Sequence, residues 1–190
     1  TPPCTDAIRA AGIRRVVAAL RDPDPDARGG VEVLRAAGIE TSVGLLAEEA
    51  AAVNAAFLAT RLQTERPFVA LKLATSIDGR IADARGRSQW LSGSEARDYV
   101  HWLRAGFHAI GVGGTTALTD NPQLTVRGAT TPRQPPVRIV FDRRAMLNSG
   151  VTLVQTAREA PTRVVASPEA PAANVSVLEG NGVRVFRPET

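Results

Sequence analysis

The chain of 190 residues is poor in several residue types, and each shortage narrows what it can be. Cys4 is the single cysteine, which excludes an intramolecular disulfide and favours a cytoplasmic compartment. No apolar run approaches the roughly 20 residues that span a bilayer, and no basic-then-apolar leader opens the chain. We therefore expect no membrane partner.

Lysine is almost absent, because the 23 basic residues include only one, Lys72. It stands in an otherwise apolar stretch that predicts a strand, with Phe68, Ala70 and Lys72 on one face and Val69, Leu71 and Leu73 on the other. Lysine differs from arginine in being a compact charge whose pKa adjusts to its surroundings. A solvated surface lysine is the ordinary alternative, but a single lysine between leucines favours a functional role.

The basic excess belongs to the second part of the chain. Up to Glu65 there are 7 basic and 9 acidic residues, and after it 16 and 10, within a net charge of +4. These arginines are scattered among acids, and aromatic residues make up only 4% of the chain. Nucleic-acid surfaces more often combine clustered charge with stacking rings. A small phosphorylated anion is at least as suitable a ligand for these scattered arginines as a nucleic acid.

Hydrophobic patterning predicts an open α/β layer in the first part. We expect a small sheet with helices over residues 6–11, 31–37 and 45–62 and strands over residues 15–20 and 41–43. The last helix is alanine-rich and long, with Val53, Phe57 and Leu58 on its apolar face. Residues 63–66 then join it to the second part.

The second part is also predicted to be α/β. Ser92 and Glu95 have the spacing of a capping box, which predicts a helix up to Ala105 with Ala96, Val100 and Leu103 toward the core. Strands are expected over residues 109–112, 137–141, 163–166 and 183–186, and loops over residues 129–136 and 167–174.

Several polar residues in this part are candidates for binding an anion. The strand that ends in Gly113 and Gly114, with a helical turn after it, can present backbone N–H groups to a phosphate, although glycines after strands are usually turns. Arg104 and Arg127 either form surface ion pairs or jointly grip a phosphate. Asp120 has the spacing of a turn cap.

Trp90 and Cys4 are weaker candidates for a site. Tryptophan can cover a flat cofactor ring, but ordinary packing is its commoner role. A zinc site needs three or four ligands, and Cys4 has no second cysteine as a partner. Zinc binding by the chain as it stands is therefore not expected.

Six segments in this order resemble the bifunctional bacterial riboflavin-biosynthesis deaminase/reductase. They are TPPCTDAI (1–8), RPFVALKLA (66–74), SIDGRIA (76–82), SQW (88–90), HWLRA (101–105) and DNPQLTVR (120–127). The resemblance is specific through Arg127 and weakens beyond Asp142. It implies the C-terminal part of a cytidine-deaminase-like αβα layer in residues 1–63. Residues 66–190 would be the N-terminal part of a dihydrofolate-reductase-like domain.

The resemblance also implies an activity and a site. The activity is NADPH-dependent reduction of the ribosyl group of 5-amino-6-(5-phosphoribosylamino)uracil, a phosphorylated pyrimidine, to a ribityl chain. Lys72 would lie by the sugar. The implied NADPH contacts are Ala74, Trp90, Thr116, Asp120 and Arg143, the last standing where relatives often have serine. The implied substrate contacts are Ser88, Arg104, Leu124 and Arg127.

Two departures accompany the resemblance. The family's other zinc ligands and its catalytic glutamate would lie upstream of Thr1, so Cys4 would bind zinc only if they were restored. The Glu-Gly-Gly segment of the reductase is not matched by Leu178-Glu179-Gly180. We therefore expect an internal fragment, incomplete at its C-terminal end. The alternative functions are a pterin-type NADPH reductase and an arginine-rich nucleic-acid-binding module. The sequence leaves the oligomeric state open, a homo-oligomer included.

Overall fold

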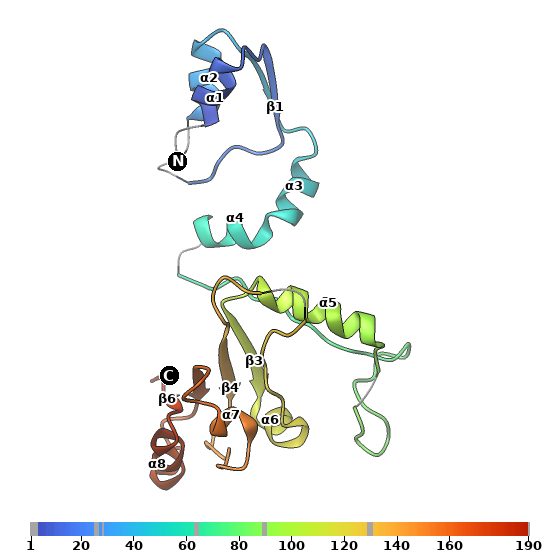
Figure 1. The fold of residues 1–190 in the computed structure, drawn as a ribbon, viewed down its shortest axis with the longest axis vertical. Coiled ribbons are helices and arrows are strands. Elements are labelled where there is room, and N and C mark those ends of the chain that lie inside the picture. The colour runs from blue at the N-terminus through green and yellow to red at the C-terminus, as the bar shows by residue number, and fades with distance from the viewer. Residues whose placement is uncertain are drawn as a thin grey trace. The chain divides into compact units, whose positions relative to one another are not determined.

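The structure is a computed structural model that describes residues 4–24, 27, 29–62, 65–88, 91–128 and 131–189. The chain divides into two compact units, one up to Leu73 and one from Ala74 (Figure 1). The boundary lies shortly after the linker expected at residues 63–66. The assignment of the two parts as a deaminase remnant and a reductase domain stays a prediction.

The first unit begins with the α/β alternation that the sequence predicts. Its elements are α1 (Cys4–Ala10), β1 (Arg15–Ala18), α2 (Gly30–Ala36) and β2 (Glu40–Val43). The strands pair in parallel, from Arg15 opposite Glu40 to Ala18 opposite Val43. Leu34 and Ile39 are buried beside this pair. A parallel pair needs a crossover connection, which α2 provides.

The single long helix predicted over residues 45–62 is wrong. The structure has α3 (Ala47–Val53) and α4 (Ala55–Leu62), with Asn54 between them. The Asn54 side chain donates to the Ala50 carbonyl at 2.8 Å, and such local bonding of an asparagine competes with continuation of the helix. The expected apolar face is also not buried, since Val53 is 87% exposed.

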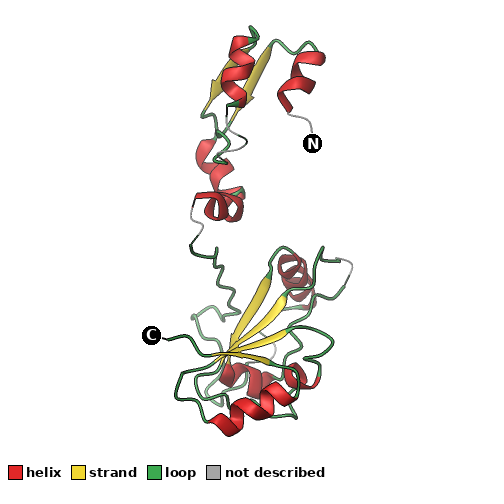
Figure 2. Ribbon diagram, turned by 90° about the vertical axis from the view of Figure 1, so that its left-hand side faces the viewer, coloured by secondary structure: helices red, strands yellow, loops and turns green. Residues whose placement is uncertain are grey.

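The second unit is built on a four-stranded parallel sheet in the order β3-β4-β5-β6 (Figure 2). The strands are β3 (Ala109–Gly113), β4 (Val137–Phe141), β5 (Thr162–Val165) and β6 (Arg184–Phe186). The sequence predicts all four to within one residue at each end. Because the strands are parallel, their carboxyl ends lie along one edge, where Gly113 is opposite Phe141.

The hydrophobic core of the second unit is formed by one face of this sheet and by side chains of three helices. They are α6 (Gly114–Asp120), α7 (Thr152–Gln155) and α8 (Ala172–Gly180). Ala117, Leu153 and Leu178 are fully buried together with Val140 and Val164 of the sheet. Helix α7 was not predicted, and α8 begins inside the loop expected over residues 167–174. These helices are short, so packing rather than local propensity stabilises them.

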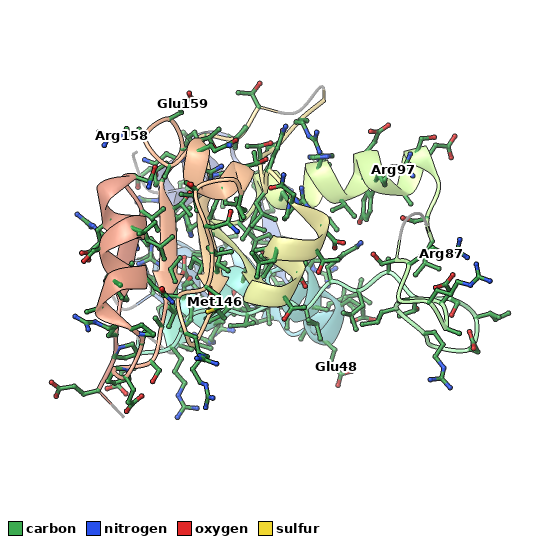
Figure 3. The ribbon with its side chains drawn as sticks, turned by 90° about the horizontal axis from the view of Figure 1, so that it is seen from below. Glu48, Arg87, Arg97, Met146, Arg158 and Glu159 are labelled. Carbon is green, nitrogen blue, oxygen red and sulfur yellow. The ribbon has the colours of Figure 1, made fainter. Side chains whose placement is uncertain are left out.

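The capping box predicted at Ser92 is wrong. Helix α5 (Ser94–Ala105) begins one residue later, with Gly93 at the N-cap and no side-chain cap. The Ser92 carbonyl instead accepts from the Arg97 guanidinium at 2.6 Å (Figure 3). The expected core stripe is not buried either, since Ala96 is exposed and Val100 only half-buried.

Arg138 is the main polar group inside the second unit. It lies on β4, is 1% exposed, and donates to Thr156 Oγ1 at 2.7 Å and to the carbonyls of Thr156 and Ala160 at 3.0 and 2.6 Å. A longer contact of 3.4 Å reaches the Gln123 carbonyl. The guanidinium thus ties the sheet to the chain that leads into Leu124.

Candidate functional site

Arg104 and Arg127 form a concentration of positive charge in the second unit. Arg104 lies on α5, is half-buried, and donates from Nη1 to the Thr125 carbonyl at 3.3 Å. Burial lowers the pKa of Arg104, and the charge of Arg127 lowers it further. Neither guanidinium forms an ion pair with a carboxylate in the part of the chain that the structure describes. Two close, uncompensated cations suit a phosphate ligand.

His101 holds the two arginine-bearing segments together. It lies one turn before Arg104 on α5, and its Nδ1 accepts from the backbone N–H of Arg127 at 3.1 Å. Partial burial lowers the pKa of His101, and the nearby charges of Arg104 and Arg127 add to this effect. The ring is therefore neutral at pH 7, which leaves Nδ1 free to accept.

The segment that carries Arg127 has an unusual backbone. Leu124 is 3% exposed and has a φ of 53°, in the left-handed region that non-glycine residues rarely adopt. Asn121 also has a positive φ of 42°, and its Oδ1 accepts from the Thr152 N–H at 2.8 Å. Since packing and this hydrogen bond hold the strained residues, the path of the segment is set by tertiary contacts.

Polar side chains that could hold a dinucleotide lie at the carboxyl edge of the sheet. Thr116 and Asp120 are exposed on α6, four residues apart, which places them on one face of the helix. Arg143 is exposed two residues after the end of β4, the neighbour of β3. Ligands of open parallel sheets commonly bind at this edge. These residues therefore fit the implied cofactor contacts.

Gly114 explains how closely the two strand ends approach each other. A Cβ on Gly114 would lie 3.1 Å from the Cβ of Asp142, so the start of α6 and the end of β4 are in close contact. Asp142 is 7% exposed, and its carboxylate accepts from the Leu147 N–H at 3.0 Å. This bond organises the turn that presents Arg143.

Ser88 lies in a different setting. It lines a cleft of about 750 Å³ formed by residues of two adjacent turns, and the described lining includes neither Arg104 nor Arg127. Asp83 shapes one turn by accepting from the Arg87 N–H at 2.9 Å and pairing with its guanidinium at 2.7 Å (Figure 3). Those hydrogen bonds lower the pKa of Asp83. The structure thus brings Arg104 and Arg127 together but does not place Ser88 in the same cluster.

The prediction of a strand around Lys72 is wrong. Residues 67–76 form no strand, and Lys72 is exposed, as are Leu71 at 83% and Val69 at 78%. A strand needs a partner for its backbone N–H and C=O groups, and among the described residues none pairs with this segment. Lys72 belongs to the first unit, whereas Ala74, half-buried, begins the second.

The remaining candidates are Cys4 and Trp90. Cys4 is exposed at the start of α1, and the described residues contain no group of three metal-binding side chains. The described residues therefore do not fit a zinc ion. Trp90 lies outside the described residues.

The second unit matches a known protein family over nearly its whole length. A family model described as the RibD C-terminal domain matches residues 67–188. The chain belongs to this family. It is 44% identical over 187 residues to the riboflavin biosynthesis protein RibD of Aquifex aeolicus, which covers 98% of the chain and 51% of that protein. RibD of Escherichia coli is 45% identical over 154 residues, and this match covers 75% of the chain and 42% of that protein.

Solved RibD structures have the same fold. A deaminase/reductase from Thermotoga maritima superposes with a TM-score of 0.72 at 37% identity, covering 97% of this chain and 57% of that one. Acinetobacter baumannii RibD superposes with a TM-score of 0.70 at 34% sequence identity. The match covers 100% of this chain and 52% of that one. The predicted α/β fold and family are confirmed. The chain spans about half the length of these relatives. No helix among the described residues is long and apolar enough to cross a membrane.

His101 is the residue whose role the sequence did not predict. In the sequence it stands in the HWLRA segment, without a role of its own. Its spacing of three residues from Arg104 places both on one face of α5. The 26-residue separation from Arg127 gave no indication of their contact.

Proposed function

We propose that the second unit belongs to an NADPH-dependent reductase of riboflavin biosynthesis. Its substrate would be 5-amino-6-(5-phosphoribosylamino)uracil, whose ribosyl group becomes a ribityl chain. The observation that carries the proposal is the Arg104 and Arg127 pair in a chain of the RibD C-terminal domain family. The name of the Thermotoga maritima protein includes this uracil reductase.

The arginine pair would bind the ribose phosphate. Arg104 uses Nη1 on the Thr125 carbonyl, which orients its guanidinium and leaves its other N–H groups available. Arg127 is exposed and forms no ion pair among the described residues. A phosphate would relieve the repulsion between the two cations. The same pair favours a phosphorylated substrate over an unphosphorylated pterin.

The carboxyl edge of the sheet would hold the cofactor. Thr116 and Asp120 present a hydroxyl and a carboxylate on one face of α6, and Arg143 adds a cation suited to the 2′-phosphate of NADPH. Ala74 and Trp90 would complete the contacts. When bound, NADPH supplies the hydride, so the protein mainly binds, orients and stabilises charge.

Three substrate-side residues have narrower roles in the proposal. Lys72 would place its ammonium near the ribose oxygens, Leu124 would contact the substrate from its strained turn, and Ser88 would add a hydroxyl. Zinc would belong to a complete deaminase domain, with Cys4 as one ligand. A cytoplasmic location and a homo-oligomer remain compatible proposals.

The test is NADPH oxidation with the phosphorylated uracil substrate, using the native protein that contains this chain. We expect substrate-dependent loss of NADPH absorbance and formation of the ribityl product. Oxidation that proceeds equally with an unphosphorylated pterin would favour the alternative reductase. Salt-dependent binding to random DNA, without turnover, would favour the nucleic-acid module instead.

A further inference from the structure

We propose that His101 is a positioning residue for the phosphate site, acting through the backbone of Arg127. The proposal rests on the proposed function, because it concerns the same phosphate ligand. Its basis is the hydrogen bond from the Arg127 N–H to His101 Nδ1, which joins α5 to a segment 26 residues away.

The chemistry of the two partners sets the state of the ring. A backbone amide can only donate, so Nδ1 carries no proton and the neutral ring has its proton on Nε2. Burial and the charges of Arg104 and Arg127 lower the pKa of His101. A hydrogen bond between the ring and the Thr125 backbone, and more weakly the charge of Asp98, raise it, but the net direction is downward. The groups around the ring therefore keep it in the form that can accept this bond.

The geometry explains why the phosphate site needs this bond. Arg104 and His101 lie one turn apart on α5 and both contact the segment that ends in Arg127. Arg104 holds the Thr125 carbonyl, and His101 holds the amide two residues later. Two successive attachments fix the direction of the segment, so the guanidinium of Arg127 is held near that of Arg104.

The bond also opposes two unfavourable features. The segment follows the strained Leu124, and the guanidiniums of Arg104 and Arg127 repel each other. Both features favour movement of Arg127 away from α5 when no anion is bound. An anchor on the backbone can resist this movement without using the donors that the phosphate needs. His101 thereby preorganises the site.

The experiment compares two substitutions of His101 with ribose 5-phosphate as the probe. In His101→Asn, Oδ1 stands where Nδ1 stood and keeps the acceptor. In His101→Leu, a side chain of similar size lacks it. We expect His101→Leu to weaken binding about three- to tenfold, the range for one hydrogen bond, and His101→Asn to bind nearly as the wild type does. The exposed His108, changed to asparagine, is the matched control and should change nothing.

Nuclear magnetic resonance of the unliganded chain gives a second readout. The wild type should show the neutral Nε2–H tautomer of His101 and slow hydrogen exchange at the Arg127 amide. That protection should disappear in His101→Leu and return in His101→Asn. This measurement on the wild type stands even where a variant folds poorly.

Each result bears on a distinct part of the reasoning. Unchanged affinity in His101→Leu, or an asparagine variant as weak as the leucine variant, overturns the role of His101 and leaves the arginine pair intact. A wild-type chain that does not bind ribose 5-phosphate overturns the phosphate site itself, and the proposal with it.

Discussion

The arginine pair offers the most direct test of the site, through replacement of Arg127 by alanine. Arg127 is exposed and makes no ion pair among the described residues, so its side chain contributes little to stability. A charge-assisted hydrogen bond is worth about 1.5–3 kcal/mol. Loss of its contacts to a phosphate should therefore weaken ribose 5-phosphate binding roughly 10- to 150-fold. Thermal unfolding should be nearly unchanged.

Arg104→Ala should weaken binding by a similar factor, with an additional loss of stability. Its Nη1 bond to the Thr125 carbonyl, 3.3 Å long, is lost as well, which costs about 0.5–1.5 kcal/mol of unfolding free energy. The double variant should lose less binding free energy than the two single variants together, because both side chains bind the same phosphate. Wild-type binding should weaken with salt, since the attraction is partly screened.

The assay is isothermal titration with ribose 5-phosphate and, separately, with NADPH. Arg133→Ala, which changes another exposed arginine, is the matched control and should bind normally. The phosphate reasoning is refuted if both arginine variants bind ribose 5-phosphate as the wild type does. Equal losses for ribose 5-phosphate and NADPH would instead indicate a folding defect or a misassigned site.

Lys72→Met in the native protein should lower kcat/KM about a hundredfold, a loss of about 2.7 kcal/mol of transition-state stabilisation, with unchanged NADPH affinity. Lys72→Arg should not restore kcat/KM. Near-normal kinetics in the methionine variant would show that Lys72 is an ordinary solvated lysine. Metal analysis of the chelator-washed chain should find no stoichiometric zinc at Cys4, and one tightly held zinc would contradict this. Arg138→Met should lower the free energy of unfolding of the second unit by about 3 kcal/mol, measured by denaturant unfolding, because buried carbonyls lose their hydrogen-bond donor. An unchanged free energy of unfolding would show that burying the charge costs as much as its hydrogen bonds contribute. Because the pKa of His101 is lowered in the folded chain, the unfolded chain binds a proton first as the pH falls below 6.5. The free energy of unfolding should therefore fall in this pH range, and it should fall less in a His101→Asn variant.

Much of the fold was predictable because its signals are local. The four strands of the second unit are short apolar runs bounded by turn residues, and the structure places them within one residue of the prediction. The short helices α7 and α8 were not predictable in this way. Helix α7 has only four residues and exists because Leu153 and Val154 are buried in the core.

The candidate site was predictable as a set of residues but not as an arrangement. The segments that contain Arg104 and Arg127 could be identified from their resemblance to a family. Their proximity could not, because 22 residues separate them and the intervening chain includes a strand, a helix and a strained turn. Lys72 shows the opposite error: the apolar stretch around it predicts a strand, but no described segment pairs with it to supply the backbone hydrogen bonds.

The sequence alone determined the class of the protein. A single cysteine, scattered arginines, apolar strands and the ordered segments up to Arg127 were sufficient for an α/β fold and a family. Tertiary structure alone decided which polar groups meet. The bond between His101 and Arg127, and the attachment of Arg138 to distant carbonyls, join residues far apart in the chain. Local propensity acts over a few residues, whereas such contacts depend on the packing of whole elements.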